Sequence, residues 1–166
     1  MLKNKIEKIK KFILKNNNDI NIPIFSDFLE WFYEKLNLHF FWIKPRIKFK
    51  KWEIYFVNLW KNIWTELNKI RPCLIYSKKS FNSINWIVII PFKSYNWKKI
   101  IEKFQIKIEK SHINNLRKSS ICDIFHIKYI STKRLKWKVW IIENKYLEEI
   151  DKKVLLMFDI KIKDEK

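Results

Sequence analysis

Arg71 is the residue of this chain best placed to stabilise negative charge, because Pro72 follows it and marks the start of an apolar run. Proline has no N–H for a ladder hydrogen bond, so Pro72 belongs at the beginning of a strand. An arginine directly before it would lie at the rim of the sheet, where its planar guanidinium can hold two oxygens of a phosphate. A surface arginine beside a strand, without a ligand, is the alternative.

His126 is a second candidate for chemistry, since an imidazole titrates near neutral pH and can act as an acid or a base. A lone histidine in a strand is more often structural or exposed. The three histidines lie far apart and the two cysteines, Cys73 and Cys122, form no C-x-x-C pair. This spacing is not that of a zinc site, and we expect neither a metal ion nor another cofactor. Both cysteines fall in predicted strands, which favours reduced, buried thiols in a cytoplasmic protein.

The charge balance points to a polyanionic partner. The chain has 36 Lys plus Arg against 17 Asp plus Glu, a net charge of +19 over 166 residues. Such a field attracts polyanions and accelerates encounter with them, so RNA is the expected partner. Lysine enrichment in an AT-rich genome is a competing, non-functional source of part of this charge. No apolar run approaches the roughly 20 residues that span a bilayer, and we expect no membrane association.

The hydrophobic pattern predicts an α+β domain preceded by helices. Residues 1–15 form a basic amphipathic pattern, and a second helix is expected from about residue 26 to 38. Short apolar or alternating segments predict strands at residues 53–59, 73–76, 86–92, 104–109, 120–130 and 138–142. Ser131 to Leu135 is expected to form a short capped turn, and Asn144 to cap a final helix.

Several segments resemble, in order, the motifs of the MazF/PemK (Kid) family of toxin endoribonucleases. They are WEIY at 52–55, WTEL at 64–67, RPCLI at 71–75, IPFKS at 90–94 and IKYISTKRL at 127–135. The resemblance covers roughly residues 50 to 160. It implies a small SH3-like β-barrel of five to six strands with a C-terminal helix. We therefore expect a family domain at residues 46–166 and a two-helix N-terminal extension with a basic connector at residues 1–45.

The resemblance implies the toxin of a type II toxin–antitoxin system, a metal-independent endoribonuclease that cuts single-stranded RNA, such as mRNA, at short sequences. It also implies a homodimer restrained by a cognate antitoxin. Arg71 matches the family's arginine. Glu66 matches its glutamate, which would accept a proton or orient the arginine, and a purely structural role is the alternative.

Two positions depart from the family pattern in a way that matters for catalysis. Lys93 replaces the threonine that works with the arginine, and Ser94 follows it. Lys93 can act as a point cation, and Ser94 can supply a hydroxyl if the register shifts by one residue. His126 stands where many members have glutamine. Lys93, together with Leu67 and Phe125, which also replace family residues, supports a second hypothesis, a catalytically impaired RNA-binding or partner-binding module on the same fold. DNA binding through the N-terminal helices is a third.

RNA contacts are expected from basic and aromatic side chains near the loop and the strand ends. Lys69, Lys128 and Arg134 are candidates for phosphate contacts, with plain surface charge as the alternative. Tyr55 is a candidate for stacking on an RNA base, and core packing is its alternative.

Tryptophan stands where the family has glycine, most clearly at positions 52, 64 and 140 and also at 60 and 137. The chain has 0 Gly and 9 Trp, whereas about 12 glycines are expected in this length from average usage. We hypothesise that UGA encodes glycine in the native host and has been read as tryptophan. The alternative is that the tryptophans are native and serve as core residues or as stacking platforms.

Overall fold

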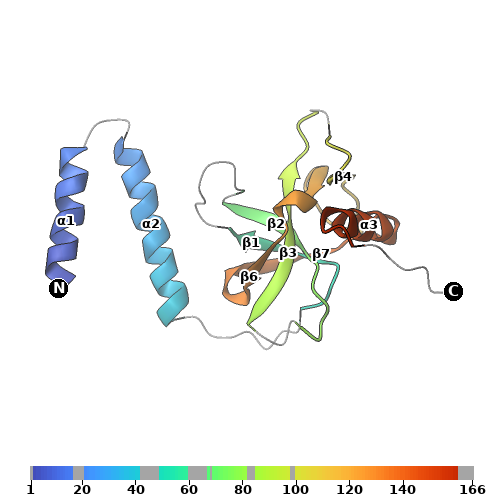
Figure 1. Ribbon diagram of the computed structural model, residues 1–166, viewed down its shortest axis with the longest axis horizontal. Helices are drawn as coiled ribbons and strands as arrows, with labels where there is room; N and C mark the ends of the chain where they lie inside the picture. Colours follow the sequence, from blue (N-terminus) through green and yellow to red (C-terminus); the bar gives the residue numbers. More distant parts are fainter. Residues whose placement is uncertain are drawn as a thin grey trace. The chain divides into compact units, whose positions relative to one another are not determined.

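The computed structural model describes residues 2–16, 21–41, 49–59, 67, 69–81, 85–97 and 100–160, in two compact units that comprise residues 1–43 and 44–166 (Figure 1). The first unit contains α1 (Leu2–Lys15) and α2 (Asn21–Phe40). The predicted first helix is confirmed. The predicted start of the second helix is wrong, because Pro23 lies in its first turn, where the missing N–H costs no helical hydrogen bond. None of the described side chains of this unit is buried.

α1 and α2 contact each other through an edge-to-face pair, Phe12 and Phe25, whose ring centroids are 6.1 Å apart. Among the described residues, no helix combines the length and the hydropathy needed to cross a membrane.

The second unit is built on a seven-stranded antiparallel sheet with the order β4-β5-β3-β2-β1-β7, in which β6 also pairs with β3. The strands are β1 (Glu53–Asn58), β2 (Ile70–Ile75), β3 (Trp86–Ser94), β4 (Gln105–Ile108), β5 (Ser120–Asp123), β6 (Lys128–Ser131) and β7 (Leu135–Ile141). A single turn, η2 (Thr132–Arg134), joins β6, which pairs with β3, to β7, which pairs with β1. The predicted α+β barrel-like fold class is confirmed.

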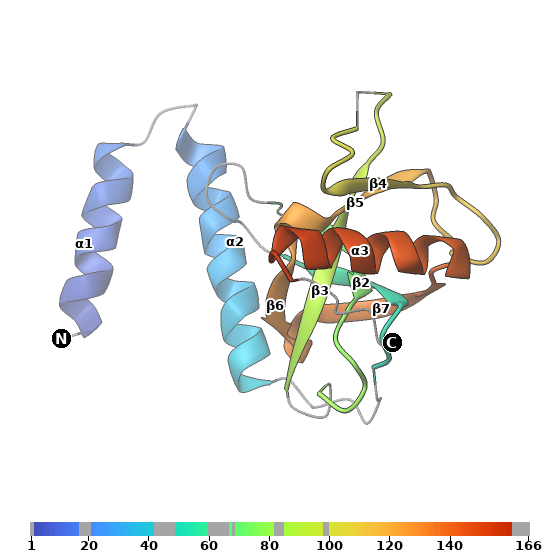
Figure 2. The same ribbon diagram turned by 45° about the vertical axis from the view of Figure 1, so that its right-hand side comes forward.

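Side chains alternate between the two faces of this curled sheet and form two cores. On one face, Ile54, Leu74 and Ile90 pack with Ile150 and Val154 of α3 (Leu147–Met157), which lies across the sheet in Figure 2. On the other face a second core is made of Phe49, Tyr55, Val57, Leu59, Cys73, Ile75, Ile87, Ile89 and Ile130. β3 has buried apolar residues on both faces, as its nearly continuous apolar sequence predicts.

Two predictions near the C-terminal half are wrong in detail. The segment 120–130 is two strands separated by η1 (Ile124–His126), because β5 pairs with the end of β3 whereas β6 pairs with its beginning. This extra break also raises the number of strands above the five to six expected. Asn144 does not cap α3, since the short turn η3 (Asn144–Tyr146) comes before it. The capped turn after Ser131 is confirmed, with Ser131 Oγ accepting from the backbone N–H of Lys133.

Candidate nucleic-acid interface

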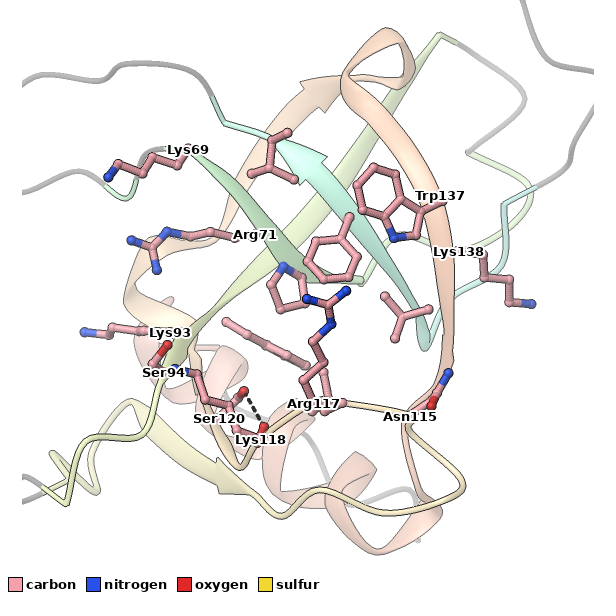
Figure 3. Close-up of a pocket in the computed structure, with 16 residues that line it drawn as sticks. Lys69, Arg71, Lys93, Ser94, Asn115, Arg117, Lys118, Ser120, Trp137 and Lys138 are labelled. Atoms are coloured by element: carbon pink, nitrogen blue, oxygen red, sulfur yellow. Dashed lines mark hydrogen bonds between the residues drawn. The ribbon is translucent and has the colours of Figure 1, made fainter.

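Arg71 and Lys93 are brought together by the antiparallel pairing of β2 with β3. Cys73 lies opposite Pro91, and continuing this register by two residues sets Arg71 opposite Lys93. Residues that lie opposite each other on neighbouring antiparallel strands point to the same face of the sheet. Arg71 and Lys93 therefore project from one side, and Figure 3 shows them extending next to each other. Both are half-buried. A guanidinium and an ammonium therefore stand side by side at the rim of the sheet.

These two residues belong to a pocket of about 560 Å³, called here the basic pocket. The start of β2, the end of β3, the loop between β4 and β5, and β7 line it. Its positively charged lining residues are Lys69, Arg71, Lys93, Arg117, Lys118 and Lys138. Within the described part of the chain, its lining includes no carboxylate and no imidazole. A cavity whose charged lining residues are all positive attracts and concentrates polyanions.

Apolar side chains form the floor of the basic pocket beside these cations. Phe56 of β1 and Trp137 of β7 pack with ring centroids 5.0 Å apart, and Pro72 and Phe92 continue the apolar surface. Trp137 is exposed. Aromatic surface next to cations is the combination on which single-stranded nucleic acids bind, with bases stacked and phosphates paired.

Arg117 was not singled out by the sequence analysis, yet its side chain reaches toward the middle of the basic pocket (Figure 3). It lies in the β4–β5 loop, which the left-handed backbone of Asn115 (φ 50°) turns; asparagine tolerates that conformation better than most residues. After Arg117, the Ser120 hydroxyl donates to the carbonyl of Lys118 at 3.0 Å. The sequence signal was the turn-forming pair Asn114-Asn115, directly before Leu116 and Arg117.

His126 lies in η1 and does not line the basic pocket. Its Nδ1 is 3.1 Å from Oδ2 of Asp123, and the same oxygen forms an ion pair with Lys93. Asp123 was not predicted either. The structure therefore connects His126 with the basic pocket through Asp123 and Lys93 rather than by direct contact.

Tyr55 has no ring face open to a base, because it is only 5% exposed and packs edge to face on Phe49 with centroids 5.5 Å apart. Burial, together with the nearby carboxylate of Glu53, raises the pKa of Tyr55 to about 12. Of its two alternatives, the structure places this residue in the core.

The other predicted residues divide between the pocket and its surroundings. Lys69 and Ser94 line the basic pocket, whereas Lys128 on β6 and Arg134 in η2 do not. Lys128 lines a separate hollow with Phe81 and Tyr129. Glu66 lies outside the described residues.

The two cysteines are free and fully buried. Burial raises the pKa of Cys73 well above its usual value, while the charges of Arg71 and Lys128 act in the opposite direction; burial likewise raises the pKa of Cys122. Both thiols therefore stay protonated at neutral pH. Among the described residues, no group of three His, Cys, Asp or Glu side chains is placed to hold a metal ion.

The sheet, α3 and the basic pocket all fall within residues 50–158, which match the family model of PemK-like, MazF-like toxins of type II toxin-antitoxin systems. The match spans more than half of the chain, so the chain belongs to this family. No curated protein sequence matches the chain.

Solved structures of MazF toxins share the fold. MazF from Deinococcus radiodurans is 14% identical with a TM-score of 0.56, covering 68% of this chain and 98% of that one. The Mycobacterium tuberculosis toxin MazF-mt6 is 14% identical with a TM-score of 0.52, covering 66% and 99%. An endoribonuclease in complex with its cognate antitoxin, from Mycobacterial species, is 12% identical with a TM-score of 0.53, covering 69% and 98%. At these identities the likeness concerns the fold.

Proposed function

We propose that this chain is the toxin of a type II toxin–antitoxin pair and cuts single-stranded RNA at short sequences without a metal ion. The convergence of Arg71 and Lys93 at one rim of the basic pocket supports the proposal most strongly. Membership of the toxin family supports it independently. A homodimer in the cytoplasm, held inactive by a cognate antitoxin, completes the proposal; one similar structure is that of an endoribonuclease with its antitoxin.

Cleavage in this proposal uses the 2′-hydroxyl of the RNA as the nucleophile. The 2′-oxygen attacks the adjacent phosphorus, the bond from phosphorus to the 5′-oxygen breaks, and a cyclic phosphate and a 5′-hydroxyl end result. Negative charge grows on the phosphate oxygens as the new bond forms, and a preorganised cation stabilises it. Arg71 would hold two of these oxygens through its planar fork. Lys93 would act on the same phosphate as a point charge.

The reaction also requires that a base take the proton of the 2′-hydroxyl and that an acid protonate the leaving 5′-oxygen. Glu66, predicted as the acceptor, lies outside the described residues. Among the described lining residues there is neither carboxylate nor imidazole. That observation favours a second candidate, a module on the same fold that binds RNA in the basic pocket without cutting it.

One assay separates the two candidates. The full chain is incubated with a long single-stranded RNA in EDTA, and new 5′ ends are mapped by primer extension. Discrete cuts that vanish in Arg71→Ala and at a 2′-deoxy substitution support the toxin, whereas RNA bound in a salt-sensitive way but left intact supports the binding module. The matched control is Lys152→Ala on α3, which removes one charge from an exposed i,i+4 pair with Glu148.

A preparation with glycine at all nine tryptophan positions tests the decoding hypothesis in the same assay.

A further inference from the structure

Asp123, at the end of β5, is a fully buried carboxylate with an uneven set of partners. Three groups approach its Oδ2: the ammonium of Lys93, Nδ1 of His126 at 3.1 Å, and Nε2 of Gln105, which donates a hydrogen bond at 3.3 Å. Its other oxygen, Oδ1, is also buried and has no hydrogen-bond partner in the structure as described. The partners thus gather on the oxygen that Lys93 reaches.

A carboxylate withdrawn from water is costly unless a positive charge and hydrogen bonds compensate it. Lys93 supplies an ammonium group here, and its side chain is still 31% exposed. It therefore extends from the lining of the basic pocket to a buried anchor. The register places that anchor on the strand next to β3, with Lys93 opposite Ile121 and Phe92 opposite Cys122.

We infer that Asp123 is a positioning residue that acts through Lys93, fixing the ammonium at the rim of the basic pocket opposite Arg71. A free lysine is a flexible four-carbon stem, and ordering it on binding costs free energy. The ion pair with a buried carboxylate orders it beforehand. An ammonium has three N–H donors, so one bond to Asp123 leaves two for phosphate oxygens. The inference rests on the proposed function, in that RNA phosphate is the ligand.

The inference also accounts for the position at which this chain departs from the family pattern. Where the pattern has a neutral threonine, a lysine brings a charge to the rim, and Asp123 supplies the buried countercharge. Lys93 and Asp123 are then one functional unit, so once Lys93 has been changed, a change at Asp123 should have little further effect on catalysis.

A double-mutant cycle on the full chain tests this. Asp123→Asn keeps the shape of the side chain and removes its charge, and it is made alone and together with Lys93→Met. The kcat and KM for RNA cleavage and the RNA Kd are measured for all four proteins. We expect Asp123→Asn to lower kcat/KM about 10-fold alone and by less than about twofold beside Lys93→Met, since residues in one network are not additive. An equal loss in both backgrounds would overturn the inference.

Stability is measured on the same four proteins because Lys93→Met leaves Asp123 buried without its ammonium partner. We expect the single variant to unfold at lower urea than the double variant, in which the uncompensated charge is gone. The more exposed ion pair Lys107–Glu109, 2.5 Å apart, supplies the control cycle, Lys107→Met with Glu109→Gln, and its coupling should be smaller because solvent screens an exposed pair. A coupling between Lys93 and Asp123 no larger than that of the control pair would contradict the inference.

A further measurement needs no change at Lys93. An ammonium fixed by a buried carboxylate gives an ordered lysine ¹⁵Nζ resonance, and Asp123→Asn should return that resonance to the position of the exposed lysines. An unchanged resonance would contradict the inference. If the unaltered chain binds RNA without cutting it, the proposed function fails, and the same cycle read as RNA Kd still decides whether Asp123 acts through Lys93.

Discussion

The β4–β5 loop joins two regions of opposite electrostatic design. Its second half presents Arg117 to the basic pocket, whose described lining has no carboxylate. Its first half belongs to what we call the Glu143 anchor, formed by Ser111, Asn114 and Glu143. There the carboxylate of Glu143 accepts hydrogen bonds from Ser111 Oγ at 2.6 Å and from Asn114 Nδ2 at 3.1 and 3.0 Å.

The Glu143 anchor matches its buried polar groups with partners. Asn114 is fully buried, and its side chain also accepts from the backbone N–H groups of Ser111 and Leu116 and donates to the carbonyl of Glu109. Burial by itself would raise the pKa of Glu143, but the hydrogen bonds from Ser111 and Asn114 outweigh it and the pKa is lowered. The acid therefore stays charged and holds the loop in place.

The basic pocket gathers like charges instead, and the acids that pair with two of them stay outside its lining. Lys93 pairs with Asp123 and Lys138 with Glu53, the latter at 2.7 Å. Like charges brought together repel and cost stability, so this arrangement is better explained by ligand binding than by folding. The contrast predicts that substitutions in the pocket change activity, whereas substitutions in the Glu143 anchor change stability.

The largest effect is expected at Arg71. Arg71→Ala removes the guanidinium that would stabilise the growing charge on phosphate, and losing one such donor lowers kcat by about 10² to 10³-fold. Arg71→Lys keeps the charge but not the two-pronged geometry and should recover only part of the rate. The measurement is RNA cleavage in EDTA with urea unfolding alongside. If the activity of Arg71→Ala falls only as far as its folded fraction falls, the contrast between the two regions is contradicted.

The next effect is expected in the Glu143 anchor. Asn114→Ala removes one of the two side chains that donate to the buried Glu143 carboxylate and the acceptor of two backbone N–H groups, which should lower the free energy of unfolding by about 2–3 kcal/mol. Asn144→Ala, at an exposed position in η3, is the matched control and should change it by less than about 0.5 kcal/mol. Urea unfolding monitored by circular dichroism measures both. Equal midpoints for the two variants would show that the anchor does not stabilise the loop.

A smaller effect is expected at Arg117, where the loop meets the pocket. Arg117→Ala should weaken binding of single-stranded RNA by about 10-fold at low salt and reduce the slope of log K against log salt by about 0.7 for each phosphate that the variant no longer neutralises. Arg134→Ala, outside the lining, is the control of equal charge. Fluorescence anisotropy across a salt series measures both variants. If Arg134→Ala has the larger effect, the RNA follows a different path over the surface.

Local patterns were enough to predict most of the strands, whereas the partnership of Arg71 with Lys93 was implied by the family resemblance. β2 begins at Ile70, so that Pro72 is its third residue rather than its first, and β3 ends at Ser94. Antiparallel neighbours set the start of one strand beside the end of the other. The sequence pattern could not separate β5 from β6, because apolar residues, Ile124, Phe125 and Ile127, continue between them. The break depends on which half of β3 each strand pairs with.

Asp123 and the Glu143 anchor escaped sequence analysis for a related reason. Asp123 lies inside what reads as one continuous strand, and its contact with Lys93 depends on strand pairing between distant segments. Asn114 and Glu143 are 29 residues apart, and no periodicity connects them. Contacts of this kind are fixed by the tertiary fold, so single-sequence patterns predict the elements but not the buried polar groups between them.

The tryptophans can be divided by backbone geometry in a way that the sequence does not show. Among the described residues, five non-glycine residues have a positive φ, and two of these are tryptophans, Trp52 at 75° and Trp97 at 60°. Trp52 is also one of the positions where the family pattern has glycine. The left-handed conformation costs a residue with a Cβ roughly 1–2 kcal/mol, and glycine avoids this cost. The geometry thus agrees with glycine at these two positions, and the decoding hypothesis remains a prediction.

The smallest effect is therefore expected at Trp97, which is 87% exposed and touches Tyr95. Trp97→Gly and Trp97→Ala both remove the indole that packs on Tyr95, so their difference isolates the backbone, and glycine should be the more stable by about 1 kcal/mol. At Trp86, within β3, the order should reverse, with alanine more stable by about 0.5–1 kcal/mol. Urea unfolding of the four variants measures both differences. Alanine equal to or better than glycine at Trp97 would remove the geometric support for glycine there, whereas the intact mass of protein from the native host decides the decoding itself.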